Sequence, residues 1–189
     1  MIGYALCGSF CTIRRSLAQL EKLCISYPVQ GIVSEAVFGT DTRFSPARDV
    51  IDRVETLTGR PVIHSIVDAE PLGPATPLDA LILCPCTGNT LAKMANGITD
   101  STVTMAAKAH LRGNRPLIIA LASNDALSAN LKNIGEMLTR KGVYFVPMRQ
   151  DDPEKKPHSL VADFSLLPVT LEAARDNDFA FDWQAYTPP

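Results

Sequence analysis

The sequence lacks the features that indicate a nucleic-acid-binding, a membrane-spanning or an exported protein. Aromatic residues make up only 6% of it, and 18 basic residues nearly balance 20 acidic ones, for a formal net charge of −2. Since neither a basic stripe nor interleaved aromatic residues occur, no nucleic-acid partner is expected. No apolar run reaches the roughly 20 residues of a membrane-spanning helix. Residues 2–7 form a strand-length apolar run that a turn follows at once, unlike a signal peptide, so the sequence predicts a cytoplasmic protein without membrane contact.

Cysteine is present in an odd number, five, in a chain that shows no export signal. Free thiols are therefore expected rather than disulfide bonds. Cys84 and Cys86 could form a metal or redox pair, but no second Cys-x-x-Cys and no histidine cluster stands at ligand spacing. We therefore expect no metal site, with Cys84 buried in a strand and Cys86 in a loop near a ligand.

Hydrophobic residues make up 46% of the chain, which is enough for a core, and the length suits one domain spanning residues 1–189. Short apolar runs alternate with helical patterns, and this alternation is typical of an α/β doubly wound parallel sheet. Strands are expected at 2–7, 29–33, 61–63, 80–84, 116–121 and 143–146. Helices are expected at about 13–24, 46–58, 91–95, 101–112, 127–138 and 164–174.

The stretch from Ala80 to Asp100 is the most informative part of the sequence. Its first five residues suit a buried strand, which Pro85 should end because proline cannot donate to a strand ladder. A polar loop follows, then a helix that Asn96–Gly97 should end, and Asp100 should cap the next helix. An ordinary strand, loop and helix is one reading. The other is a ligand site, since open α/β sheets bind ligands where a strand leads into such a loop.

Gly8 and Ser9 follow the first predicted strand and precede a helix. Backbone N–H groups at such a turn meet the positive end of the helix dipole and can hold a phosphate group, although a plain turn is an alternative reading. Arg14 and Arg15 either add charge to this site or form a solvated face. The dinucleotide motif Gly-x-Gly-x-x-Gly is absent, so no nicotinamide site is expected in this chain.

Ser34 and Asn124 stand at two further predicted strand ends. Ser34 follows the strand at 29–33, and Asn124 lies in the polar loop after the strand at 116–121. Parallel strands share their C-terminal edge, so these residues should lie on the same edge as the two loops above. Such an edge, formed by several polar loops, supports a nucleotide-like ligand.

The string Pro85-Cys-Thr-Gly-Asn-Thr-Leu-Ala-Lys-Met-Ala-Asn-Gly-Ile-Thr-Asp100 resembles the Pro-Ala-Ser/Thr-Ala-Asn-Thr…Lys-Ile-Ala-x-Gly-x-Ala-Asp signature of the homo-oligomeric flavin-containing cysteine decarboxylase superfamily. The resemblance implies a three-layer, Rossmann-like fold of the flavoprotein type. It also implies FMN as a cofactor and a homo-oligomer that builds flavin sites at subunit contacts. By the same resemblance, flavin phosphate or ring would be held by Gly8, Ser9, Ser34, Cys86, Thr87, Asn89 and Asp100.

His64 and Asn124 are the catalytic candidates that the resemblance implies. His64 follows a predicted strand, as the family's catalytic histidine does, and a neutral imidazole can take a proton near neutral pH. A lone histidine is more often structural, however, and the segment Asp68–Pro77 lengthens the gap to the signature. That segment is expected to reshape the pocket or to contact a partner. Asn124 is what remains of the decarboxylases' Pro-x-Met-Asn clamp, and it could orient a carboxylate.

Within this superfamily the string continued to Arg112 is most similar to one member, which is part of an NADP-linked dehydrogenase. That enzyme oxidises a small dihydropyridine dicarboxylate in the mother cell of a sporulating bacterium, together with a nicotinamide-binding partner. The resemblance therefore implies an oxidoreductase subunit. Two alternatives stay open: a flavoprotein-like binding subunit without chemistry of its own, and an FMN-dependent decarboxylase of the phosphopantothenoylcysteine type. The second alternative is disfavoured, because only Asn124 remains of the Pro-x-Met-Asn clamp of the decarboxylases.

Overall fold

The computed structural model describes residues 1–73 and 75–176, and one sheet of seven strands runs through them. The strand order is β2-β1-β3-β4-β7-β6, and β5 also pairs with β4. The strands are β1 (Ile2–Leu6), β2 (Val29–Val33), β3 (Ala80–Thr87), β4 (Leu117–Ser123), β5 (Val143–Phe145), β6 (Met148–Arg149) and β7 (Leu160–Ala162). Strands β1 to β5 pair in parallel, whereas β7 runs antiparallel to β4 and β6. Residues 177–189 of the expected single domain lie outside the described residues.

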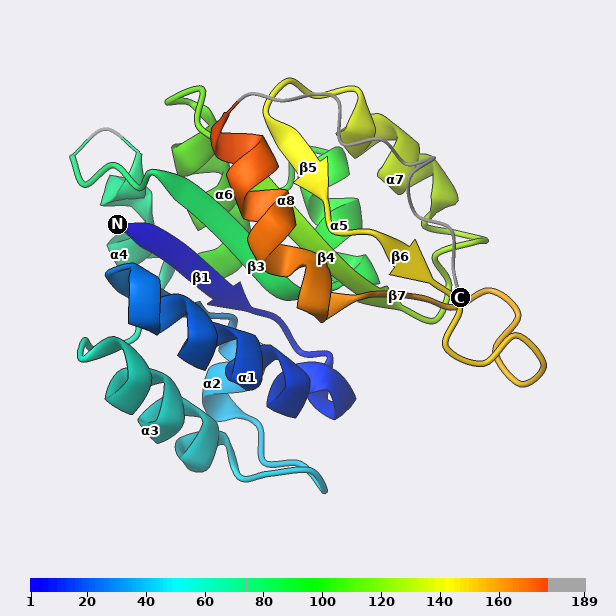
Figure 1. Cartoon of the computed structure of the whole chain (residues 1–189), viewed down its shortest axis with the longest axis horizontal. Coiled ribbons are helices and arrows are strands. Elements are labelled where there is room, and N and C mark those ends of the chain that lie inside the picture. The colour runs from blue at the N-terminus through cyan, green and yellow to red at the C-terminus, as the bar shows by residue number, and fades with distance from the viewer. Residues whose placement is uncertain (74, 177–189) are drawn as a thin grey trace.

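Helices cover both faces of the sheet, so the fold has three layers (Figure 1). Helices α1, α3 and α8 pack on one face, and α4 to α7 pack on the other. The helices are α1 (Phe10–Ser26), α2 (Glu35–Gly39), α3 (Ala47–Thr58), α4 (Ile66–Ala69), α5 (Gly88–Ala95), α6 (Thr102–Leu111), α7 (Leu131–Leu138) and α8 (Leu167–Arg175), with short 3-10 turns η1 (Glu70–Leu72) and η2 (Phe164–Leu166). This arrangement confirms the predicted three-layer, Rossmann-like α/β fold.

The central strands are buried along their whole length, as expected for parallel strands with helices on both faces. Several predicted elements differ from the structure; the helix expected from residue 127, for example, begins only at Leu131. Residues 61–63 do not form a strand of the sheet. Only Ile63 makes a bridge, to Ile32 on the outer side of β2. The polar loop expected from residue 148 onward begins with the short strand β6, which pairs with β7. Within the described residues, no helix combines the length and the apolar character that crossing a membrane requires.

Strand β3 contains a bulge at the start of the signature. Its register against β4 shifts between Leu83 and Cys86, where two residues of β3 stand opposite one of β4. A bulge tolerates Pro85 in a central strand because one residue there has no ladder partner. The prediction that the strand ends at Pro85 is therefore wrong, since β3 continues to Thr87.

The bulge also reverses the side-chain directions that follow it. Strict alternation would place Ile82, Cys84 and Cys86 on one face of the sheet. Instead, Ile82 and Cys84 pack in the cluster beneath α1, whereas Cys86 packs in the cluster on the other face. The Ser16 hydroxyl of α1 donates a hydrogen bond to the Cys84 carbonyl, and the Tyr4 hydroxyl donates to the Ser16 carbonyl at 2.9 Å. These bonds join α1 to both strands at the bulge.

Gly31 in β2 lies directly beneath α3, and a Cβ at this position would collide with the buried side chain of Val54. We therefore expect Gly31→Ala to lower the free energy of unfolding by about 1–3 kcal/mol, because a well-packed core resists added volume. Urea denaturation of the parent and the variant measures the difference.

Gly135→Ala is the matched control for that experiment. Gly135 lies in α7, where an added Cβ meets no atom within 4 Å. The better helix propensity of alanine should raise the free energy of unfolding by about 0.5–1 kcal/mol. A similar change in both variants would mean that backbone entropy, and not the close approach of α3 to β2, governs Gly31.

Candidate functional site

Strands β1, β3 and β4 are neighbours in the sheet and run in parallel. The loops after Leu6, Thr87 and Ser123 therefore emerge side by side at one edge, which we call the carboxyl edge. The sequence predicted that these three loops share an edge, and the strand order confirms it. The carboxyl edge is thus the place where ligands of open α/β sheets bind.

The first loop of the carboxyl edge leads into α1 through Gly8 and Ser9. Ser9 is the N-cap of α1, but its side chain makes no hydrogen bond to the first N–H groups of the helix. Instead, the Thr12 hydroxyl donates to the Ser9 carbonyl at 2.9 Å and lies 3.1 Å from the Ser9 hydroxyl. The first turn of α1 contains no acidic residue. Its N-terminus therefore keeps open donors and a positive potential, which favour an anion.

Ser34 lies beside this first loop, because its N–H donates to the Leu6 carbonyl at 3.0 Å. Its hydroxyl caps α2 only through a long bond, 3.4 Å, from the Val37 N–H. The next residue, Glu35, accepts hydrogen bonds of 2.8 Å from both the N–H and the hydroxyl of Thr102. The structure thus brings Ser34 together with Gly8 and Ser9, while Glu35 fastens the start of α6.

The second loop of the carboxyl edge is reduced to a junction, where β3 ends at Thr87 and passes directly into the first turn of α5 with Asn89. The Thr87 hydroxyl caps α5 by accepting a bond of 3.2 Å from the Thr90 N–H, and it lies 3.0 Å from the Thr90 hydroxyl. Asn89 is exposed in the first turn of α5. Thr87 therefore holds the helix start in place, and the Asn89 side chain is free to meet a ligand at this edge.

Asp100 does not cap α6, contrary to the prediction. Ser101 is the N-cap, and it forms a reciprocal capping box with Thr104. The Asp100 carboxylate instead accepts a bond of 2.8 Å from the Lys93 ammonium, and this contact lowers the pKa of Asp100. Both side chains of this pair reach solvent, so it adds little to stability.

Cys86 is a buried strand residue and not the loop residue that the sequence predicted. Its thiol donates a hydrogen bond of 3.6 Å to the Thr87 carbonyl, and it interacts with the buried thiol of Cys7, which follows β1. The interaction of the two thiols raises the pKa of Cys86, with burial adding to the effect, and lowers the pKa of Cys7. All five cysteines are free thiols. In the described part of the chain, no group of three or more His, Cys, Asp or Glu side chains could hold a metal ion.

The third loop of the carboxyl edge contains a hydrogen-bonded network that the sequence analysis missed. The Asn130 amide donates to both oxygens of the Asp125 carboxylate, at 2.9 and 3.0 Å, and the Ser123 hydroxyl donates to the same group. Asn133 donates in turn to Asn130 at 2.8 Å. Asn124 is exposed between Ser123 and Asp125. The only sequence signal was the run of hydroxyl, amide and carboxyl residues after β4.

His64 and Asn124 do not come together in one chain. The His64 ring is exposed and stacks on Phe38, with ring centroids 3.9 Å apart. The preceding Ile63 lies outside β2, so strands β2, β1 and β3 separate it from β4. Four strand spacings correspond to about 19 Å. A shared role of the two side chains would therefore need a second chain or a large ligand.

Part of the segment Asp68–Pro77, residues 69–73, packs against α6. Ala69 and Leu72 are buried there, and a Cβ on Gly73 would collide with the Ala109 backbone. This segment therefore packs on α6, the helix that begins after Asp100. Whether it also contacts a partner stays a prediction.

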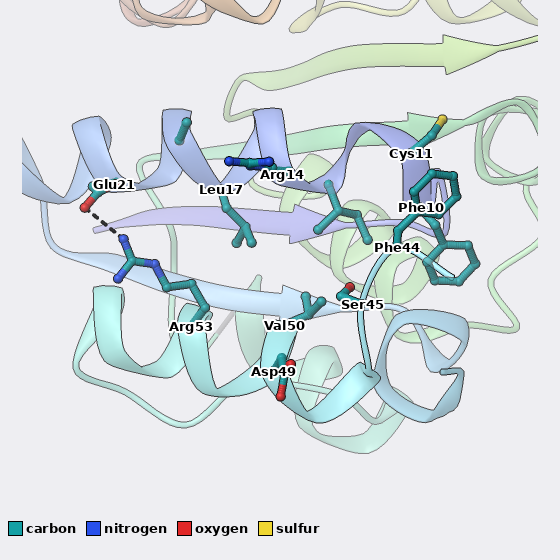
Figure 2. A pocket seen from close by; sticks show the side chains of 12 residues that line it. Phe10, Cys11, Arg14, Leu17, Glu21, Phe44, Ser45, Asp49, Val50 and Arg53 are labelled. Atoms are coloured by element: carbon teal, nitrogen blue, oxygen red, sulfur yellow. Dashed lines mark hydrogen bonds and ion pairs between the residues drawn. The ribbon is translucent and has the colours of Figure 1, made fainter. Parts of the chain in front are cut away.

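An apolar groove of about 640 Å³ runs between α1 and α3, and it begins next to the first loop (Figure 2). Phe10 and Phe44 lie at that end, and Phe10 is in contact range of Gly8. An ion pair of 2.9 Å between Glu21 and Arg53 bounds the groove further along α1. The groove offers an apolar surface beside the anion-favouring end of α1.

Comparison with known proteins relates this arrangement to one family. The chain is 45% identical over 174 residues to the B subunit of dipicolinate synthase from Bacillus subtilis (strain 168), covering 92% of this chain and 87% of that protein. Its fold matches a crystal structure of the dipicolinate synthase B subunit from Bacillus halodurans C with a TM-score of 0.85 and 43% identity, over 93% of this chain and 90% of that one.

A crystal structure of AnUbiX (PadA1) in complex with FMN and dimethylallyl pyrophosphate matches with a TM-score of 0.65 over 98% of both chains. At 19% identity, this likeness concerns the fold alone. The model of the family described as Flavoprotein matches residues 2–163, which include all three loops of the carboxyl edge. The chain therefore belongs to the flavoprotein family.

Proposed function

We propose that this chain is the B subunit of a dipicolinate synthase, an oxidoreductase that converts dihydrodipicolinate to dipicolinate in the mother cell of a sporulating bacterium. The observation that carries the proposal is the 45% identity to such a protein along almost the whole chain. The carboxyl edge supports it, because three polar loops and an open helix N-terminus suit a phosphate-bearing cofactor.

FMN is the cofactor that we propose for the carboxyl edge. The open N–H groups at the start of α1, with Gly8, Ser9 and the nearby Ser34, fit its phosphate. Thr87 and Asn89 fit its ribityl chain or ring, and the buried Cys86 supports the strand beneath them. When bound, FMN supplies a group that can accept hydride. Asp100, paired with Lys93, would contact the cofactor from the start of α6 rather than from these loops.

The chain's own residues would bind and orient, and a partner would complete the reaction. No nicotinamide fingerprint occurs in the sequence, so we propose that NADP is held by the nicotinamide-binding A subunit of dipicolinate synthase. Asn124, exposed at the end of β4, would orient a substrate carboxylate through its amide N–H group. A homo-oligomer is part of this proposal, because it would bring His64 of one chain near the edge of another.

A binding subunit without chemistry of its own is the second candidate. It is favoured by the separation of His64 from Asn124, since the candidate proton acceptor then lies four strand spacings away from the amide that would orient the substrate. An FMN-dependent decarboxylase of the phosphopantothenoylcysteine type is the less favoured alternative, because only Asn124 remains of that clamp.

Asn89→Leu should abolish or strongly weaken flavin binding while the fold stays intact, because it replaces an exposed amide at the carboxyl edge with an apolar side chain. Titration calorimetry with FMN measures the binding. Asn96→Leu is the matched control, because Asn96 lies at the other end of the same helix, where its amide donates to the Ala92 carbonyl. Unchanged FMN affinity in Asn89→Leu would remove this loop from the proposed site.

The isolated chain should not dehydrogenate dihydrodipicolinate with NADP, whereas addition of the nicotinamide-binding partner should give full activity. The reason is the missing nicotinamide site in this chain. Absorbance of the reduced nicotinamide reports the reaction. An isolated chain that completes the dehydrogenation would show that no partner is needed.

His64→Ala should lower kcat of the two-subunit enzyme by about 10²–10⁴-fold if His64 acts as a general base. His64→Phe should have the same effect on kcat, although it keeps a ring that can stack on Phe38. Under the structural reading, His64→Ala alone lowers the melting temperature, and kcat per folded molecule stays unchanged in both variants. Measuring kcat and melting temperature on the pair of variants therefore decides the role of His64.

A further inference from the structure

We propose that the Asp125 carboxylate accepts a hydrogen bond from a ring N–H group of the bound ligand, and so fixes the direction in which the ligand lies along the carboxyl edge. This inference rests on the proposed FMN site. It concerns the part of the carboxyl edge at the end of β4, and adds a contact with the flavin ring there.

The Asp125 carboxylate is held in one position. Asn130 donates to both of its oxygens, at 2.9 and 3.0 Å, and the Ser123 hydroxyl donates to Oδ1. Two further bonds fix the backbone, because the N–H groups of Ser128 and Asn130 both donate to the Asp125 carbonyl at 3.1 Å. A side chain fixed in this way loses little entropy when it binds a ligand.

The carboxylate lies directly against the signature loop. At Gly88, the first residue of α5, a Cβ would lie 3.0 Å from Asp125 Oδ1 and 2.6 Å from Asn130 Nδ2, and it would collide with the Ser123 hydroxyl. Glycine therefore allows the third loop to touch the second one. Asp125 consequently stands next to Thr87 and Asn89, which the proposed cofactor site already includes.

Asp125 has acceptor capacity left for a ligand. Its Oδ1 accepts two hydrogen bonds and its Oδ2 accepts one, whereas a carboxylate offers about four acceptor positions. The side chain is only partly buried. The bonds from Ser123 and Asn130 lower the pKa of Asp125, so the group is ionised at neutral pH. No Lys or Arg among the described residues forms an ion pair with it.

The two ends of the carboxyl edge therefore prefer opposite partners. The open N-terminus of α1 favours an anion, whereas the Asp125 carboxylate attracts hydrogen-bond donors. Strand β3 lies between β1 and β4, so the two ends are separated by two strand spacings, about 10 Å. FMN carries a phosphate at one end and a ring N–H group, at N3, at the other. The structure thus assigns its phosphate to α1 and its N3–H to Asp125.

The test compares FMN with its N3-methyl derivative, which lacks the N–H group, by titration calorimetry of the full chain. The parent protein should bind FMN about 10–100-fold more tightly, as expected for a hydrogen bond to a charged group. In Asp125→Asn, the amide oxygen at the Oδ1 position can keep one bond each from Ser123 and Asn130, whereas the Asn130 bond to Oδ2 is lost and an NH₂ group stands there instead. We expect FMN binding to fall to the level of the N3-methyl derivative, so that the preference disappears.

Two further variants separate recognition from loop stability. Ser123→Ala removes one bond that fastens the loop but keeps the carboxylate, so it should lower the melting temperature and keep the preference for FMN. Asp79→Asn changes an acid at the opposite edge of the sheet, beside the N-terminus, and should also keep the preference.

An equal FMN preference in the parent and in Asp125→Asn would overturn the proposal, and Asp125 would then only fasten the third loop to α5. A parent protein that binds neither flavin would overturn the proposed FMN site itself, and this inference with it. The two failures are distinct, because the first still shows flavin binding.

Discussion

The shape of the carboxyl edge depends on the bulge in β3 and on the hydrogen bond from Ser16 to the Cys84 carbonyl. The bulge shifts the side-chain alternation by one residue, which turns Cys86 toward Cys7 and places Thr87 where it caps α5. Ser16 lies in α1, the helix whose start forms the first loop of the edge. One hydroxyl thus joins the helix that offers open donors to the strand that carries the signature.

The helices that begin at this edge differ in the partners of their first N–H groups. Thr87 caps α5, and α6 is capped by Ser101 and contacted by the Glu35 carboxylate, so both helices have partners for their first N–H groups. Helix α1 differs, because the Ser9 side chain gives it no cap. Since Asp125 adds negative charge beside α5, the positive potential of the edge is concentrated at α1. The start of α1 is therefore the part of this edge that best suits a phosphate group.

Much of the fold could be predicted from the sequence. Strands that are buried on both faces of a sheet consist of short apolar runs, such as 80–83 and 117–121, which are visible in the sequence itself. The grouping of Ser34 with Gly8 and Ser9 was implied by the family resemblance, and the neighbouring positions of β1 and β2 bring them together. The bulge at Pro85 could not be predicted, because it depends on register against β4. Equally, the Asp125 network and the stacking of His64 on Phe38 join segments through tertiary contacts that no local pattern contains.

The short antiparallel strands at the end of the sheet have a consequence for assembly. Strand β4 divides its outer side between β5 and β7, and the last strand, β6, has only two residues. At the other end, Ile63 pairs with the backbone of β2 through its own N–H and carbonyl groups. Neither end of the sheet presents a long row of unpaired backbone groups, so another strand would gain few hydrogen bonds by adding there. Among the described residues, helices and loops therefore offer more surface for assembly than the ends of the sheet do.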